Sequence, residues 1–120
     1  MKNYRIQKSP FTVPTTEDKL IQEHWGDSMN TPQISIARMV APPGWSEPHQ
    51  TPDFDEFTLI VSGKKQIEID GDTVVLQAGE SILVNKGARV RYSNPFDSDC
   101  EYIAVCTPAF SPESVHREEP

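Results

Sequence analysis

The sequence has few of the features that mark secreted, membrane or nucleic-acid-binding proteins. Its 120 residues include 11 lysines and arginines against 18 aspartates and glutamates, which gives a formal net charge of −7. A surface of this sign repels phosphate backbones and anionic lipids, so we expect neither nucleic acid nor a membrane as partner. No apolar run approaches the roughly 20 residues of a membrane span. The first ten residues lack the apolar segment of a signal peptide, so we expect a cytoplasmic protein.

Cysteine is scarce as well, and the two cysteines are too far apart along one predicted strand to form a disulfide. Cys100 and Cys106 are six residues apart. Six residues of strand span about 20 Å, whereas a disulfide joins Cα atoms about 5.5 Å apart. We therefore expect free thiols in a reducing compartment, with Cys106 as a small core residue rather than a nucleophile.

Turn residues divide the chain into short segments and leave no room for a long helix. There are 11 prolines and six glycines. We expect strands over residues 33–40, 57–61, 65–69, 73–76, 81–84, 88–93 and 101–106. The Asp70-Gly71 pair between two β-rich runs predicts a tight hairpin, because this turn needs residues that tolerate positive φ. Seven or eight short strands predict an all-β sandwich or barrel in a single domain.

The chain divides into an irregular N-terminal arm over residues 1–30, a β-barrel over residues 31–110 and a short tail over residues 111–120. Within the arm, residues 16–25 fit either a short helical turn after a threonine cap or an extended segment packed on the barrel or on a second subunit. An arm without its own core usually packs on something, so we expect a homodimer. The tail carries prolines and mixed charges, so we expect a loop or short helix on the outside.

Several turn glycines carry a resemblance to a known family. The first group follows a motif in which a glycine precedes two histidines, a glutamate and, seven residues later, another glycine: Gly44, His49, Glu56 and Gly63. The second group follows a second motif, in which a glycine is followed by a turn glycine, a histidine and an asparagine: Gly79, Gly87 and Asn94 keep these positions. From Ile34 to Phe110 the chain thus resembles the cupin superfamily, in particular small RmlC-like cupins. The resemblance implies a jelly-roll β-barrel with a site inside it.

The resemblance also implies a divalent metal held by three histidines and the glutamate, but this chain keeps only part of that ligand set. The second-motif histidine falls on Val90, which cannot ligate a metal. The paired histidines are reduced to His49 or, in an alternative register, to Gln50. Only His49 and Glu56 keep metal-binding side chains, whereas metal sites usually take three or four ligands. Substitute ligands lie in the same loop and in the tail: Gln50, Asp53, Asp55 and His116. We expect no cofactor or a weakly held divalent metal.

Strand alternation predicts which side chains share the cavity with Glu56. Thr58 lies on the same face of its strand, and Tyr92 on the same face as Val90. Arg38 is expected to point inward, where it either forms a structural ion pair with Glu56 or binds a ligand. The predicted ligand pocket comprises Arg38, His49, Gln50, Glu56, Thr58, Val90, Tyr92, Tyr102 and Cys106. Glu56 and Tyr92 are the predicted catalytic acid or base.

Three functions remain open from the sequence. The first is metal-independent binding of a small polar metabolite, with isomerase- or lyase-like chemistry at Glu56 or Tyr92. The second is a metal-dependent oxygenase or isomerase that uses His49 and Glu56, against which Val90 speaks. The third is a non-catalytic module for ligand sensing or dimerisation, which the long arm motivates. A mostly apolar pocket with a few convergent polar groups favours the first.

Overall fold

The computed structural model describes residues 2–15 and 18–119, and almost all regular structure within them is β-strand. The strands are β1 Phe11–Thr12, β2 Leu20–Trp25, β3 Ser35–Ala41, β4 Asp55–Ser62, β5 Lys64–Ile69, β6 Asp72–Gln77, β7 Ser81–Val84, β8 Val90–Ser93 and β9 Cys100–Thr107. A 3-10 helix, η1, covers Asp27–Met29, and a short α-helix, α1, covers Pro112–Val115. The all-β class predicted from the turn pattern is confirmed.

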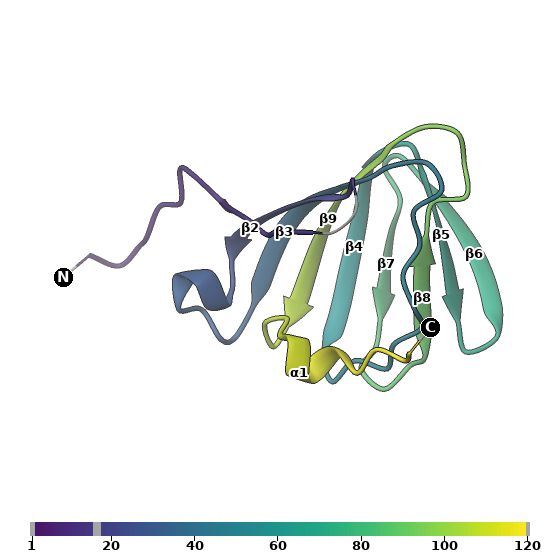
Figure 1. Ribbon diagram of the computed structural model, residues 1–120. Helices are drawn as coiled ribbons and strands as arrows, with labels where there is room; N and C mark the ends of the chain where they lie inside the picture. The colour runs from purple at the N-terminus through teal and green to yellow at the C-terminus, as the bar shows by residue number, and fades with distance from the viewer. Residues whose placement is uncertain (1, 16–17, 120) are drawn as a thin grey trace.

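The strands form two antiparallel sheets that enclose a common interior. The larger sheet has the order β1-β2-β3-β9-β4-β7, and the smaller sheet has the order β6-β5-β8 (Figure 1). Isolated bridges from Gln50 to Val90 and to Arg117 attach the loop before β4 and the C-terminal tail to the edge of the smaller sheet. This two-sheet arrangement is the jelly-roll barrel that the sequence predicted.

The tight turns lie where the sequence placed them. Ile69 pairs with Asp72, so Asp70 and Gly71 form a two-residue hairpin loop, and both have positive φ, of 47° and 91°. Gly63, between β4 and β5, also has positive φ, of 79°, and a Cβ atom there would collide with the backbone carbonyl oxygen of Asp99. Glycine is therefore required at this turn both by conformation and by the close approach of a neighbouring chain segment.

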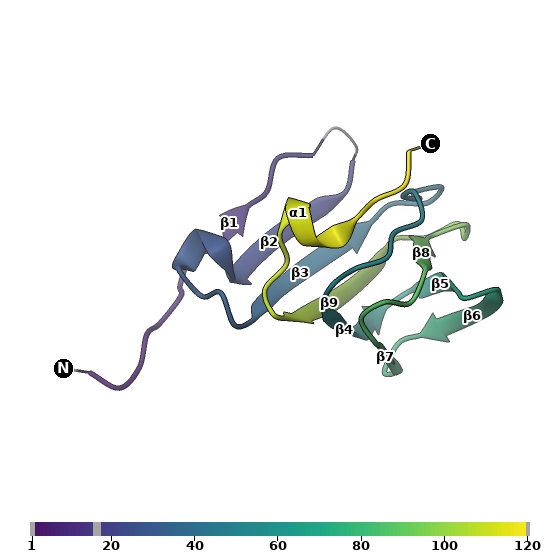
Figure 2. The same cartoon turned by 90° about the horizontal axis from the view of Figure 1, so that it is seen from below.

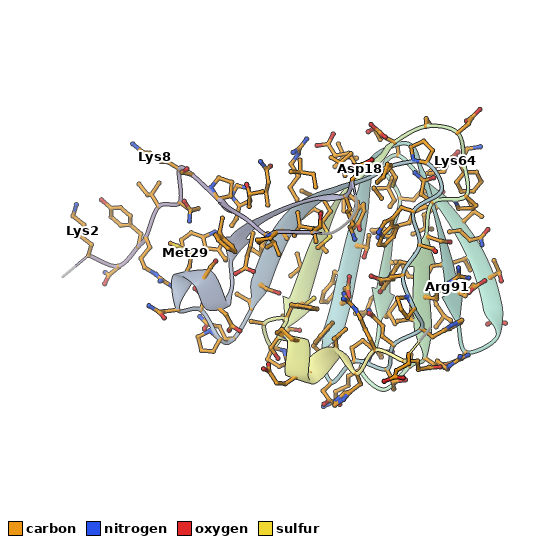
Figure 3. All side chains as sticks on the ribbon, in the orientation of Figure 1. Lys2, Lys8, Asp18, Met29, Lys64 and Arg91 are labelled. Carbon is orange, nitrogen blue, oxygen red and sulfur yellow. The ribbon has the colours of Figure 1, made fainter. Side chains whose placement is uncertain are left out.

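The N-terminal region is more regular than the sequence indicated. Leu20–Trp25 is a strand, β2, that pairs antiparallel with β3, and β1 pairs back onto β2. The helical alternative for residues 18–25 is therefore wrong, while Thr16 and Glu17 lie outside the described residues. A segment this short takes its conformation from the structure around it. Here the edge of β3 offers unpaired backbone groups, with which residues 20–25 pair as a strand. Only residues 2–10 extend away from the barrel, carrying Lys2 and Lys8 (Figures 1 and 3).

The interior packs both sheets against each other at one end of the barrel. Its main cluster includes Ile60, Ile67, Val84, Val90, Cys100 and Tyr102, all buried. Burial alternates along the whole of β9, with each second side chain from Cys100 to Cys106 inward. Both cysteines are buried free thiols, as expected.

The C-terminal tail packs on the barrel rather than lying loosely outside it. Ser111 caps α1 and accepts a hydrogen bond from the Ser114 backbone N–H. Val115 is buried beside Phe54, whose ring lies 5.9 Å from that of Phe110, centroid to centroid. Figure 2 shows α1 and the tail crossing the larger sheet, which closes part of that side. No helix in residues 2–15 or 18–119 is long and apolar enough to cross a membrane.

Candidate functional site

A cavity of about 290 Å³ lies inside the barrel, between the larger sheet, β5, β8 and the C-terminal tail. Its walls are mostly apolar, and they come from most elements of the fold: Phe11, Val13, Ile21, Ala37, Met39, Tyr92, Tyr102, Ala104, Phe110 and Pro112. Seven charged side chains of both signs also line it: Lys19, Glu23, Asp27, Glu47, Glu56, Lys65 and Arg117. A largely apolar cavity with a few convergent polar groups is typical of a small-molecule site.

Lys65 is the central cation of this cavity. It extends inward from β5 and is only 2% exposed. Its Nζ atom lies 3.2 Å from the ring centroid of Tyr102 and 4.5 Å from that of Tyr92. Burial, and then the nearby cation of Lys19, lower the pKa of Lys65 to about 7, although Glu56 acts in the opposite direction.

Glu56, on β4, is the matching acid. Burial raises its pKa to about 7, although the positive charge of Lys65 partly offsets this. The Cys106 thiol, whose own pKa is raised by burial, donates a hydrogen bond to the Glu56 carboxylate. Glu56 and Lys65 influence each other's pKa, and burial shifts the pKa of both groups in the direction of their neutral forms.

Tyr92, on β8, supplies a polar atom without a protein partner. The side chain is 3% exposed and lines the cavity, and its hydroxyl makes no hydrogen bond within the described residues. Burial raises the pKa of Tyr92 well above its usual value, and the neighbouring Glu56 carboxylate raises it further, so the hydroxyl remains a hydrogen-bond donor. Buried polar groups are nearly always hydrogen-bonded, so an unpartnered hydroxyl at a cavity wall is unusual.

Charged side chains also surround the outer part of the cavity. The Nζ atom of Lys19 lies 3.8 Å from the ring centroid of Trp45. An Arg117 guanidinium nitrogen lies 3.7 Å from a Glu47 carboxylate oxygen, and Arg117 donates a 3.3 Å hydrogen bond to Gln50. A second hollow of about 770 Å³, which shares Lys19, Glu47 and Arg117 with the cavity, leads outward between the arm and the tail. These residues therefore lie between the cavity and the outer hollow.

The structure brings together some of the residues predicted for the pocket and separates others. Five of them line the cavity: Gln50, Glu56, Tyr92, Tyr102 and Cys106. Thr58 and Val90 are fully buried in the interior, but the cavity lining does not include them. The sequence left open whether His49 or Gln50 faces the cavity, and of the two only Gln50 lines it. His49 instead places its Nε2 atom 3.5 Å from a carboxylate oxygen of Glu68.

The prediction that Arg38 points inward is wrong. On β3 the small residues Ser35 and Ala37 face the cavity, so alternation turns Arg38 to the opposite face. There its Nε atom lies 2.7 Å from a carboxylate oxygen of Glu101 on β9, and a second nitrogen donates to Gln22 on β2. Arg38 therefore joins three neighbouring strands on the outer face, and it forms no ion pair with Glu56.

Sequence reasoning missed six of the seven charged residues that line the cavity, and only Glu56 was predicted. Lys65 had a detectable signal, because strand alternation places it on one face with Ile67 and Ile69, and a lysine in such a set is unusual. Lys19 and Glu47 had none, because they reach the cavity only through the fold of the arm and of the loop before β4.

The donor set of the cavity does not fit a divalent metal. All three histidines belong to the described residues, and none lines the cavity. His116 lies against Asp53, 2.6 Å from Nε2 to Oδ2, and the position of the second-motif histidine is Val90. In residues 2–15 and 18–119, no group of three or more His, Cys, Asp or Glu side chains is arranged to hold a metal ion. The cations of Lys65 and Lys19 also oppose a metal beside Glu56.

Comparison with known proteins establishes the family. Residues 37–106 match the model described as Cupin domain, which is more than half of the chain. The chain therefore belongs to the cupin family, as its turn glycines and jelly-roll fold indicate.

The relatives differ in what their names describe. The chain is 44% identical over 117 residues to an endoribonuclease YbeY of Myxococcus xanthus, covering 97% of this chain and 40% of that protein. It spans about two fifths of the length of the curated relatives it matches. The crystal structure of the polyketide cyclase RemF from Streptomyces resistomycificus aligns with a TM-score of 0.76 at 13% identity, over 100% of this chain and 87% of that one. An RmlC-like cupin from Shewanella frigidimarina aligns with a TM-score of 0.73 at 16% identity, over 91% and 93%. These two structures show the fold alone.

Proposed function

We propose that this cupin binds a small molecule with an apolar, ring-sized body and catalyses metal-independent proton transfer on it, in an isomerase- or lyase-like reaction. The observation that carries the proposal is the grouping of Glu56, Lys65 and the unpartnered Tyr92 hydroxyl on one mostly apolar cavity. Such walls favour a ligand with an apolar body over a wholly polar metabolite.

The chemistry follows from the protonation states. A general acid or base works best when its pKa lies near the operating pH, and burial raises the pKa of Glu56 to about 7. Glu56 takes a proton from the carbon next to a ligand carbonyl, and returns it at another position. The Tyr92 hydroxyl donates a hydrogen bond to the ligand oxygen on which negative charge develops.

Binding is tested by ligand-observed NMR on EDTA-treated protein, with a panel of ring-containing alcohols, ketones and carboxylic acids. Ala104 lines the cavity, so Ala104→Phe fills it and is expected to abolish binding. Ile103, its neighbour on β9, lines a groove on the outer face, so Ile103→Phe is the matched control and is expected to retain binding. Absence of binding to the wild-type protein contradicts the proposal without reference to either variant.

Catalysis is tested by incubating the same protein with cyclic ketones in D₂O and following loss of the α-hydrogen signals. Glu56→Gln preserves shape but cannot accept the proton, and we expect exchange to slow by about 100-fold or more. Lys64→Met, at an exposed position on β5, is expected to exchange at the wild-type rate. Exchange at the wild-type rate in Glu56→Gln removes the assigned role of this carboxylate.

Binding without exchange supports the non-catalytic, ligand-sensing alternative on the same cavity. The endoribonuclease name of the Myxococcus relative is not extended to this chain. The match takes only 40% of that protein, and a formal net charge of −7 disfavours RNA as a ligand.

A further inference from the structure

Lys65 is the one lysine of the described chain that is buried, and its surroundings are unusual for a structural lysine. Lysines are almost never fully buried unless an anion pairs with them. Within the described residues the Nζ atom makes no hydrogen bond and no ion pair, and its close contacts are the ring faces of Tyr102 and Tyr92. The same side chain lines the cavity, so the amine is directed at the space a ligand would occupy.

We propose that Lys65 is a nucleophile that forms a Schiff base with the carbonyl carbon of a ring-containing aldehyde or ketone bound in the cavity. This rests on the proposed function in one respect, since the cavity must admit a small molecule. It goes further, because it names the substrate class and assigns a covalent step to a residue outside the acid–base pair of Glu56 and Tyr92.

Only the neutral amine can attack a carbonyl carbon, and the site provides that form. Burial in an apolar pocket and a second cation nearby are the two recognised ways of making a lysine nucleophilic. Both act on Lys65, because its pKa is lowered first by burial and then by the cation of Lys19. Burial also favours the protonated carboxyl group of Glu56, so the reaction begins from the free amine and the neutral acid.

The step balances with the groups present. The Nζ lone pair forms the new C–N bond, and the carbonyl π-electrons move to oxygen, which takes the proton of the Glu56 carboxyl group. The resulting Glu56 carboxylate then accepts one proton from the nitrogen, which gives the neutral carbinolamine. The Glu56 carboxyl group then returns a proton to the departing hydroxyl, the C–O bond breaks, and one water molecule leaves as the C=N bond forms.

The walls determine the rest of the ligand. The ring faces of Tyr102 and Tyr92 and the side chains of Met39, Phe11 and Phe110 surround the amine with apolar surface. The charged residues that line the cavity are three bases, Lys19, Lys65 and Arg117, and four acids, Glu23, Asp27, Glu47 and Glu56. These charges are of both signs, so the site favours an uncharged carbonyl compound over a polyanion.

The experiment is reductive trapping at neutral pH with benzaldehyde and sodium cyanoborohydride, followed by intact mass spectrometry and peptide mapping. The expected product is one benzyl group per chain, on Lys65. It should form at least about tenfold faster than on any other lysine, because exposed lysines with a pKa of about 10.4 remain protonated. Lys65→Arg keeps the positive charge and is expected to lose the adduct. Lys64→Arg, the exposed neighbour, is expected to keep it.

Benzyl alcohol separates failure of this inference from failure of the proposed function. It matches the probe in shape but has no carbonyl carbon, so its binding by ligand-observed NMR reports the cavity alone. If benzyl alcohol binds and Lys65 is not trapped, the Schiff base is wrong and the ligand cavity stands. If neither compound binds, both proposals fall. Equal modification of several lysines, or an adduct that persists in Lys65→Arg, also overturns the inference, and peptide mapping of the wild type decides this even if the variant does not fold.

Discussion

Replacing Lys65 by methionine should stabilise the protein, although it removes a side chain from the middle of the interior. Methionine has nearly the shape of the lysine stem, so no cavity is created. Burial lowers the pKa of Lys65 from 10.5 to about 7. One pKa unit corresponds to about 1.4 kcal/mol, so this burial costs on the order of 4 kcal/mol at pH 7.

Part of the stability gained by removing the buried amine is offset by the contacts that the amine makes. The ammonium lies over two tyrosine rings, and buried cation–π contacts contribute about 2 kcal/mol. Glu56 loses a neighbouring cation but remains neutral by keeping its proton. The net expectation is a rise of about 2 kcal/mol in the free energy of unfolding of Lys65→Met, or roughly 6 to 8 °C in Tm.

The pH dependence gives the more specific signature. Between pH 7 and 10.5 the unfolded chain keeps Lys65 protonated, while the folded chain has released that proton. The unfolded state then binds more protons, so wild-type stability from this group rises with pH through this window. The advantage of Lys65→Met over the wild type should therefore shrink steadily from pH 7 to pH 10.

Urea unfolding of both proteins at several pH values, followed by tryptophan fluorescence, measures this difference. Lys64→Met is the control, because Lys64 is exposed at the rim of the barrel next to Lys65 in sequence (Figure 3). A Lys65→Met protein that is less stable than the wild type at pH 7, with Lys64→Met unchanged, would refute the reasoning. It would mean that the interior stabilises the ammonium form.

Three further predictions test other features of the fold. Gly63→Ala should lower the free energy of unfolding by about 2 to 4 kcal/mol in urea titration, because the turn has positive φ and a Cβ would meet the Asp99 carbonyl oxygen; an unchanged midpoint contradicts this. Plasma mass spectrometry of untagged protein should find less than about a tenth of an equivalent of any transition metal. A stoichiometric metal that is lost in Glu56→Gln would show that the cavity side chains do bind a metal. The homodimer expected from the sequence stays a prediction, and exposed Leu59 and Leu83 on the outer face now offer a surface for it. Light scattering at micromolar concentration should give a dimer for the wild type and a monomer for Leu59→Lys/Leu83→Lys, and a wild-type monomer would end this expectation.

The sequence by itself determined the strands from β3 to β9, the tight turns and the family. These depend on local chemistry: glycine and proline fix where the chain reverses, and period-two alternation fixes which side chains share a face. It also identified Glu56 and Tyr92 as inward-facing, because each lies on a strand with a clear buried face.

Alternation alone leaves two things open: which face of a strand turns inward, and which elements meet across the interior. Tertiary structure decided both. On β3 the face of Ala37, not that of Arg38, borders the cavity, because β2 and β9 flank the strand and give Arg38 partners outside. The arm became a wall because the edge of β3 offered it backbone hydrogen bonds. The shifted pKa values of Glu56 and Lys65 exist only because strands β4 and β5 place both groups at the same cavity, and burial is a property of the fold rather than of either residue.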